Sequence, residues 1–144
     1  MEIKDIMSKH LIVGKYNDSI STISSLMNKY DIGFIPIIKD NHVIGVITDR
    51  DIVIRALPSN QKKITNCISP NIINCEIDKS IDELVDIMKK SKIKRILITE
   101  LEKVIGIVSI SDIPSEKQID LIKEIYSLNK SNFNYDTEID EFYL

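Results

Sequence analysis

The sequence predicts an α+β protein built from two copies of one β-α-β-β-α unit. Three observations predict this fold class: a gapless internal repeat, an amphipathic helix in each copy, and a strand–turn–strand pattern after each helix. Shifted by 61 positions, residues 3–52 align with residues 64–113, and 15 of these 50 pairs are identical. Such a match indicates a tandem duplication, and we expect the two copies to pack around a single core as one pseudo-two-fold module.

Each copy begins with the same expected elements. A short apolar run predicts a strand at residues 11–13 and again at residues 71–75. An amphipathic helix follows in each copy. Ser80, with Glu83 three residues later, predicts a capping box at the start of the second copy's helix. The expected apolar helix faces are Ile20, Ile23, Leu26, Met27 and Tyr30 in the first copy and Ile81, Leu84, Val85 and Met88 in the second.

Two strands joined by a polar turn are expected after each of these helices. In the first copy the strands cover residues 31–38 and 43–48, and in the second copy they cover residues 92–99 and 104–109. The turn segments are KDNH and ELEK, which lack the apolar character of the flanking residues. We therefore expect a β-hairpin in each repeat.

The repeat also sets the expected domain limits. A second helix is expected to begin near Asp51 and near Asp112, and residues 115–128 keep a helical spacing of apolar side chains. The acidic end of the chain either frays or docks Phe133, Tyr135 or Phe142 on a partner subunit. The expected divisions are residues 1–58 for the first repeat, 59–114 for the second, and 115–144 for a C-terminal helix and acidic tail.

Composition and charge exclude several classes of function. The chain has 144 residues and a net charge of −3, which gives no general basic face for nucleic acid. The N-terminus lacks the apolar run of a signal peptide and no segment has the length of a membrane span, so we expect a cytoplasmic protein with no membrane partner. Cys67 and Cys75 match no metal-ligand spacing, and His10 and His42 are too scattered for a metal site or a catalytic triad. We therefore expect no metal and no enzyme.

One seven-residue motif occurs in both copies, at residues 45–51 and at residues 106–112. It reads Gly, two hydrophobic residues, Thr or Ser, two variable residues and Asp. A hydroxyl residue three positions before an acidic one is typical of a helix N-cap, so capping alone accounts for the pattern. Alternatively, each carboxylate accepts hydrogen bonds from the two neighbouring hydroxyls of a ribose, each contributing about 1.5–3 kcal/mol. Both interpretations remain open at the level of sequence.

The repeat and its paired motif resemble the CBS domain pair, also called a Bateman module, over about residues 1–114. The chain resembles those CBS domain pairs that occur as stand-alone proteins. The resemblance implies a regulatory protein that binds adenosine-containing ligands (AMP, ADP, ATP, S-adenosylmethionine or a cyclic dinucleotide) in two clefts between the repeats. It also implies a homodimer and an effector protein that reads the ligand state. An adenine nucleotide is then a regulatory ligand, and no cofactor is obligatory.

The family pattern also implies the residues of each cleft, because each cleft takes its Asp from one repeat and much of its base pocket from the other. Lys94 and Arg95 stand where basic phosphate contacts occur in nucleotide-binding members, which makes the cleft of Asp112 the preferred site. The expected lining of that cleft is Ser109, Ser111, Asp112, Lys94, Arg95, Ile12, Ile32 and Gly33. The expected lining of the second cleft is Thr48, Arg50, Asp51, Ile73 and Ile93.

Two hypotheses of function follow. The first is a ligand-sensing regulatory module. The second is a non-catalytic structural or adaptor dimer in which the clefts are vestigial. Binding of an adenosine-containing compound distinguishes them, since only the sensor requires it.

Overall fold

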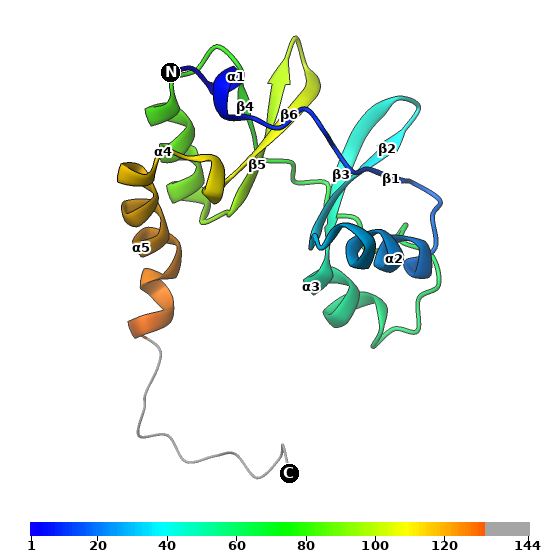
Figure 1. Ribbon diagram of the computed structural model, residues 1–144. Coiled ribbons are helices and arrows are strands. Elements are labelled where there is room, and N and C mark those ends of the chain that lie inside the picture. Colours follow the sequence, from blue (N-terminus) through cyan, green and yellow to red (C-terminus); the bar gives the residue numbers. More distant parts are fainter. Residues whose placement is uncertain (132–144) are drawn as a thin grey trace.

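The structure is a computed structural model that describes residues 1–131, and the two repeats form two lobes with matching elements (Figure 1). The elements of the first repeat are α1 (Ile3–Ile6), β1 (Gly14–Lys15), α2 (Ile20–Tyr30), β2 (Phe34–Lys39), β3 (His42–Thr48), α3 (Asp49–Asp51) and the π-helix η1 (Ile52–Ala56). Those of the second repeat are β4 (Asn74–Glu76), α4 (Ile81–Ser91), β5 (Arg95–Glu100), β6 (Lys103–Ser109), the 3-10 helix η2 (Ile110–Asp112) and α5 (Ser115–Ser131).

Each lobe contains one three-stranded mixed sheet. The strand orders are β1-β2-β3 and β4-β5-β6, with the first pair parallel and the second antiparallel in each sheet. A two-residue turn closes each hairpin, and both turn residues have positive φ: 51° and 63° at Asp40 and Asn41, 49° and 67° at Leu101 and Glu102. This geometry matches the right-handed twist of the strands. The predicted α+β class, with two hairpins, is confirmed.

The two amphipathic helices are also confirmed, since α2 and α4 begin and end at equivalent positions. The backbone N–H of Ser80 donates to Glu83 Oε2 at 2.8 Å, and the backbone N–H of Glu83 donates to Ser80 Oγ at 3.1 Å. The capping box predicted at Ser80 is therefore present, and the hydrogen bond from Ser80 lowers the pKa of the Glu83 carboxyl. Asp31 and Lys92 end the helices in the left-handed region, with φ of 52° and 53°.

The first strand of each repeat lies further along the chain than predicted. The apolar runs at residues 11–13 and 71–73 stay outside the sheets, and pairing begins at Gly14 and Asn74. Periodicity alone cannot distinguish a short buried strand from an apolar segment that covers a neighbouring surface. In both repeats the apolar run is such a segment.

The second helices differ between the repeats. After Asp51 the chain continues as the π-helix η1, whereas η2 ends at Asp112 and the next residue, Ile113, is extended with a ψ of 141°. Pro114 explains the break, because the residue before a proline is pushed out of the helical region. Helix α5 then begins at Ser115 and includes the predicted helical segment. Phe133, Tyr135 and Phe142 lie outside the described residues.

The buried side chains form two clusters rather than the single core expected from the repeat. One cluster is built on the second repeat and the other on the first, yet each contains residues from the opposite copy. Ile3 is fully buried among side chains of α4 and β5, whereas Ile64 is fully buried in the cluster of α2 and β2. The starting segments of the two repeats are therefore exchanged between the lobes.

The exchanged segments cross the hairpins at the glycines of the repeated motif. Backbone hydrogen bonds of 2.8–2.9 Å join Val46 and Ser69, and bonds of 2.9–3.0 Å join Ser8 and Ile107. A Cβ atom on Gly106 would lie 2.9 Å from the carbonyl oxygen of Ser8, and one on Gly45 would be closer still to that of Ser69. Glycine is needed at both positions because another backbone passes directly over the strand.

Among residues 1–131, no helix combines the length and the apolar character needed to cross a bilayer.

Replacing Gly45 with alanine is expected to lower the free energy of unfolding by about 1–3 kcal/mol, because the new methyl group meets a backbone carbonyl that has little room to move. Denaturant titration followed by circular dichroism measures the change. Gly33→Ala is the matched control, since its nearest obstacle is the exposed side chain of Asp49. Equal losses in the two variants would contradict the backbone-crossing explanation.

Candidate ligand-binding site

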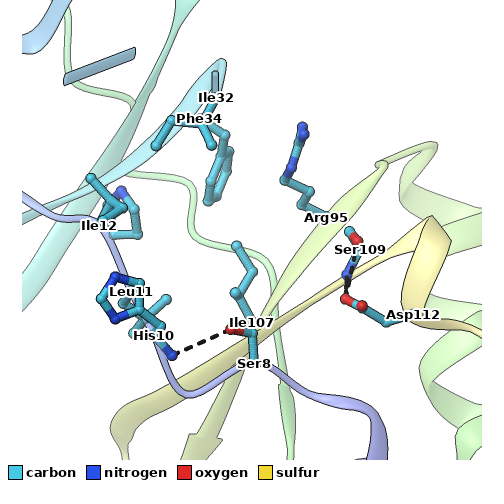
Figure 2. Close-up of a pocket in the computed structure, with 11 residues that line it drawn as sticks. Ser8, His10, Leu11, Ile12, Ile32, Phe34, Arg95, Ile107, Ser109 and Asp112 are labelled. Atoms are coloured by element: carbon cyan, nitrogen blue, oxygen red, sulfur yellow. Dashed lines mark hydrogen bonds between the residues drawn. The ribbon is translucent and has the colours of Figure 1, made fainter. Parts of the chain in front are cut away.

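Two cavities lie where the hairpin of one repeat meets the incoming segment of the other. The Asp112 cavity, named for its carboxylate, has a volume of about 180 Å³ and receives Ser109 and Asp112 from the second repeat. Ile12, Ile32 and Phe34 of the first repeat face these polar residues across the cavity (Figure 2). The cavity therefore combines an apolar wall from one repeat with a carboxylate from the other.

The Asp51 cavity is larger, with a volume of about 750 Å³. Ligand pockets in proteins measure roughly 300–1,000 Å³, so the Asp51 cavity lies in that range whereas the Asp112 cavity is below it. All five residues predicted for this cleft line it: Thr48, Arg50, Asp51, Ile73 and Ile93. Two of these come from the second repeat and three from the first, so the cavity spans the seam between the copies.

The residues predicted for the other cleft are distributed differently. Five of the eight residues predicted for it line the Asp112 cavity: Ile12, Ile32, Arg95, Ser109 and Asp112. Gly33 and Lys94 line the Asp51 cavity instead. Lys94 and Arg95 both line the Asp51 cavity, and Arg95 lines the Asp112 cavity as well. The basic pair on which the preference for the Asp112 cleft depended is therefore complete only in the Asp51 cavity.

Ser111 stands apart from the cavity lining. Its hydroxyl lies 2.8 Å from the Ser109 hydroxyl, and it is exposed at the start of η2. It contacts a lining residue without lining the cavity.

Both motif carboxylates accept hydrogen bonds from the start of the following helix. The backbone N–H and the hydroxyl of Thr48 each donate to Asp51 Oδ2 at 2.9 Å. Ser109 donates to Asp112 Oδ2 in the same way, at 2.9 Å and 3.0 Å. The capping interpretation of the motif is therefore correct as a description of these carboxylates, each through one oxygen.

The partner of the second carboxylate oxygen differs between Asp51 and Asp112. Asp51 Oδ1 lies 3.7 Å from Nη1 of Arg55, an ion pair in which the Asp51 side chain is only 14% exposed. Among the hydrogen bonds and ion pairs within residues 1–131, none involves Asp112 Oδ1. Capping and ligand binding are compatible, because capping occupies Oδ2 alone.

Several lining residues were not predicted from the sequence. Phe34 lines both cavities, as does its equivalent under the 61-residue shift, Arg95, which was predicted for the Asp112 cleft alone. Ser8 lines the Asp112 cavity, and its equivalent Ser69 lines the Asp51 cavity. The identity of Ser8 and Ser69 was visible in the repeat, but their role depends on the exchange of segments. His10, for which the sequence predicted no metal or catalytic role, is exposed and also lines the Asp112 cavity.

The cysteines lie inside the two cores. Cys67 and Cys75 are buried free thiols, and burial raises the pKa of both. Within residues 1–131, no group of three or more His, Cys, Asp and Glu side chains is placed to hold a metal ion.

Comparisons with known proteins agree with this geometry. A family model for the CBS domain matches residues 3–57 and 64–115. An uncharacterized protein of Bacillus subtilis (strain 168), YlbB, is 30% identical over 122 residues, which cover 81% of this chain and 82% of YlbB.

Solved structures with the same fold are also similar in sequence. The CBS domain pair of protein MJ0100, in complex with 5′-methylthioadenosine and S-adenosyl-L-methionine, is 31% identical with a TM-score of 0.70, covering 78% of this chain and 96% of that one. Hypoxic Response Protein I, solved with two coordinated zinc ions, is 26% identical with a TM-score of 0.69, covering 78% and 96%.

Asp112→Ala is expected to lower the free energy of unfolding by about 1 kcal/mol, because Ser109 loses its acceptor at the start of η2. Asp51→Ala should have a similar effect at the start of α3. Thermal unfolding without ligand measures both. Asp120→Ala on the exposed side of α5 is the control, and a loss no larger than that of the control would mean that capping contributes nothing.

Proposed function

The chain belongs to the CBS domain family, with two such domains in tandem, and we propose that it is a regulatory module that binds adenosine-containing ligands in its two cavities. The observation that carries the proposal is the Asp51 cavity. It is large enough for a nucleoside, it joins the two repeats, and it contains a carboxylate beside apolar and basic side chains. The described relative MJ0100, at 31% identity, supports adenosine-containing ligands as the chemical class.

The chemistry of the cavity suits each part of such a ligand. A ribose donates two neighbouring hydroxyls to one carboxylate, and Asp51 and Asp112 are the candidate acceptors. Ile73 and Ile93 offer an apolar surface to a purine ring in the Asp51 cavity. Arg50 and Arg95 are available there for phosphate oxygens, with bidentate geometry. AMP, ADP and ATP therefore fit the Asp51 cavity better than the smaller, less basic Asp112 cavity.

Regulation follows from where the cavity lies. A ligand that contacts both repeats stabilises the arrangement of the lobes in which those contacts form, and it shifts the population toward that arrangement. The size of the effect equals the difference in affinity between the arrangements. An effector protein that binds one arrangement would read the ligand state, and no catalytic step is required.

The alternative is an adaptor dimer with vestigial clefts. The small volume of the Asp112 cavity, about 180 Å³, favours this alternative for that cavity only.

A screen of thermal stability distinguishes the two functions. AMP, ADP, ATP, S-adenosylmethionine and cyclic di-AMP are added separately, and a compound present at about one hundred times its Kd adds about 2.7 kcal/mol to the free energy of unfolding. GTP is the control for general effects of phosphate. A screen in which no adenosine-containing compound raises Tm would favour the adaptor.

The same screen with single variants assigns the ligand to a cavity. Replacing the Asp that holds the ribose should weaken binding about tenfold to a hundredfold in titration calorimetry, the loss of one or two charge-assisted hydrogen bonds. The volumes favour Asp51→Ala for the larger effect. Wild-type affinity in both Asp51→Ala and Asp112→Ala would contradict ribose recognition by these carboxylates.

We further propose a homodimer formed through the second helices of the repeats. Leu57, directly after η1, is 63% exposed, and Ile119 on α5 is 60% exposed. Other apolar side chains accompany them on the same elements, which makes two apolar surfaces available to a second copy. These are Val53 and Ile54 on η1, and Ile122 and Tyr126 on α5.

Leu57→Glu combined with Ile119→Glu is expected to convert the dimer to a monomer, because two buried carboxylates per subunit would oppose association. Light scattering after size-exclusion chromatography measures the mass. Leu101→Glu is the control, since Leu101 is 89% exposed at the tip of a hairpin. A wild-type protein that is monomeric at high concentration would overturn the dimer.

A further inference from the structure

The Asp51 cavity carries an excess of positive charge. Its lining includes two acidic side chains, Asp49 and Asp51, and a larger group of basic ones. The basic lining residues are Arg50, Arg55, Lys92, Lys94 and Arg95. In the Asp112 cavity, by contrast, the charged lining side chains among residues 1–131 are Arg95 and Asp112. A phosphate-bearing ligand is therefore attracted to the Asp51 cavity much more than to the other.

Two of these basic side chains already have partners on α5. Lys92 Nζ donates to the backbone carbonyl of Glu124 at 3.0 Å and lies 3.8 Å from Glu124 Oε1. Lys94 Nζ lies over the ring of Tyr126, 5.1 Å from its centroid. Helix α5 thus contacts two of the basic side chains that line the cavity.

The attachment of α5 has a second part that does not involve the cavity. Leu121 and Ile125 are buried in the core of the second lobe, and Lys117 pairs with Asp82 of α4. Figure 1 shows α4 and α5 side by side at the end of that lobe. Loss of the lysine contacts would therefore loosen the end of α5 without detaching the helix.

The first repeat has no equivalent arrangement. The positions that correspond to Lys92 and Lys94 are Asp31 and Gly33, neither of which carries a positive charge. The link between a cavity and a following helix is thus a property of one half of the molecule and is not a consequence of the duplication.

We propose that a phosphate-bearing ligand in the Asp51 cavity and the end of α5 compete for Lys92 and Lys94. The proposal rests on the ligand binding proposed above and adds its regulation: binding loosens α5 around Glu124, and the docked helix weakens binding. The two effects are equal in size, because coupling between two sites is reciprocal. Helix α5 is then the surface element whose attachment changes when a charged ligand binds.

The exposure of the contacts limits the coupling to a modest size. The side chains of Lys92 and Glu124 are 34% and 53% exposed, and such ion pairs are weak and screened by salt. We expect an effect of about two- to fivefold on affinity for a phosphorylated ligand. Adenosine, which has no phosphate to draw the lysines away, should show none.

The test removes the two competing side-chain groups on α5, the Glu124 carboxylate and the Tyr126 ring, and leaves the backbone carbonyl of Glu124 in place. The double variant Glu124→Gln with Tyr126→Leu is expected to bind ATP about two- to fivefold more tightly than wild type in titration calorimetry, and to bind adenosine with unchanged affinity. Asp120→Asn changes the same charge on an exposed part of the same helix and should leave both affinities unchanged. An ATP affinity that does not rise, or that rises equally in Asp120→Asn, overturns the competition.

Two further measurements examine each side of the competition. Lys94→Gln should weaken ATP binding several-fold and leave adenosine binding unchanged, whereas Lys90→Gln, exposed and outside the cavity, should change neither. Amide hydrogen exchange of residues 122–131 should become faster with ATP and stay unchanged with adenosine. Exchange that stays equal or slows with ATP contradicts the proposal.

The outcomes separate this proposal from the function on which it rests. Binding of both adenosine and ATP, with no response in these variants, overturns the competition and leaves ligand sensing intact. Absence of binding by either compound overturns both.

Discussion

The exchange of starting segments between the repeats is the constraint on which the other features depend. Ile3 and Ile64 are identical partners in the repeat, and each is fully buried in the core built on the opposite copy. Neither lobe is complete alone, because each core lacks a residue that only the other repeat supplies. The crossing segments also bring Ser8 and Ser69 over the opposite hairpin. The cavities form beside these crossings, so their lining necessarily comes from both copies.

The residue type at each defined position of the repeated motif has its own physical explanation. Gly45 and Gly106 allow the exchanged backbone to pass over the strand. Thr48 and Ser109 start a helix and donate to the carboxylate three residues later. That carboxylate uses one oxygen for the helix, while its other oxygen lies 3.7 Å from Arg55 in Asp51 and has no partner among residues 1–131 in Asp112. The motif is thus structural and also chemically suited to a ligand.

Duplication produced two cavities, and divergence made them unequal. The positions after α2 and α4 carry Gly33 and Lys94, so the basic side chain occurs on one side of the seam only. Phe34 and Arg95 line both cavities and are the residues that the two cavities share. The result is one large cavity with five basic side chains and one small cavity with a single arginine, in a molecule built from two repeats.

The sequence by itself determined the duplication, the two helices, the hairpins and the capping of Asp51 and Asp112, because these depend on local spacing that repeats along the chain. It also indicated which residues of the Asp51 cavity come together. It did not determine that Lys94 and Arg95 meet in the Asp51 cavity, that the cores are two, or where β1 and β4 begin. Those features were decided by the tertiary structure, since strand register and the exchange of starting segments both depend on residues far apart in the sequence.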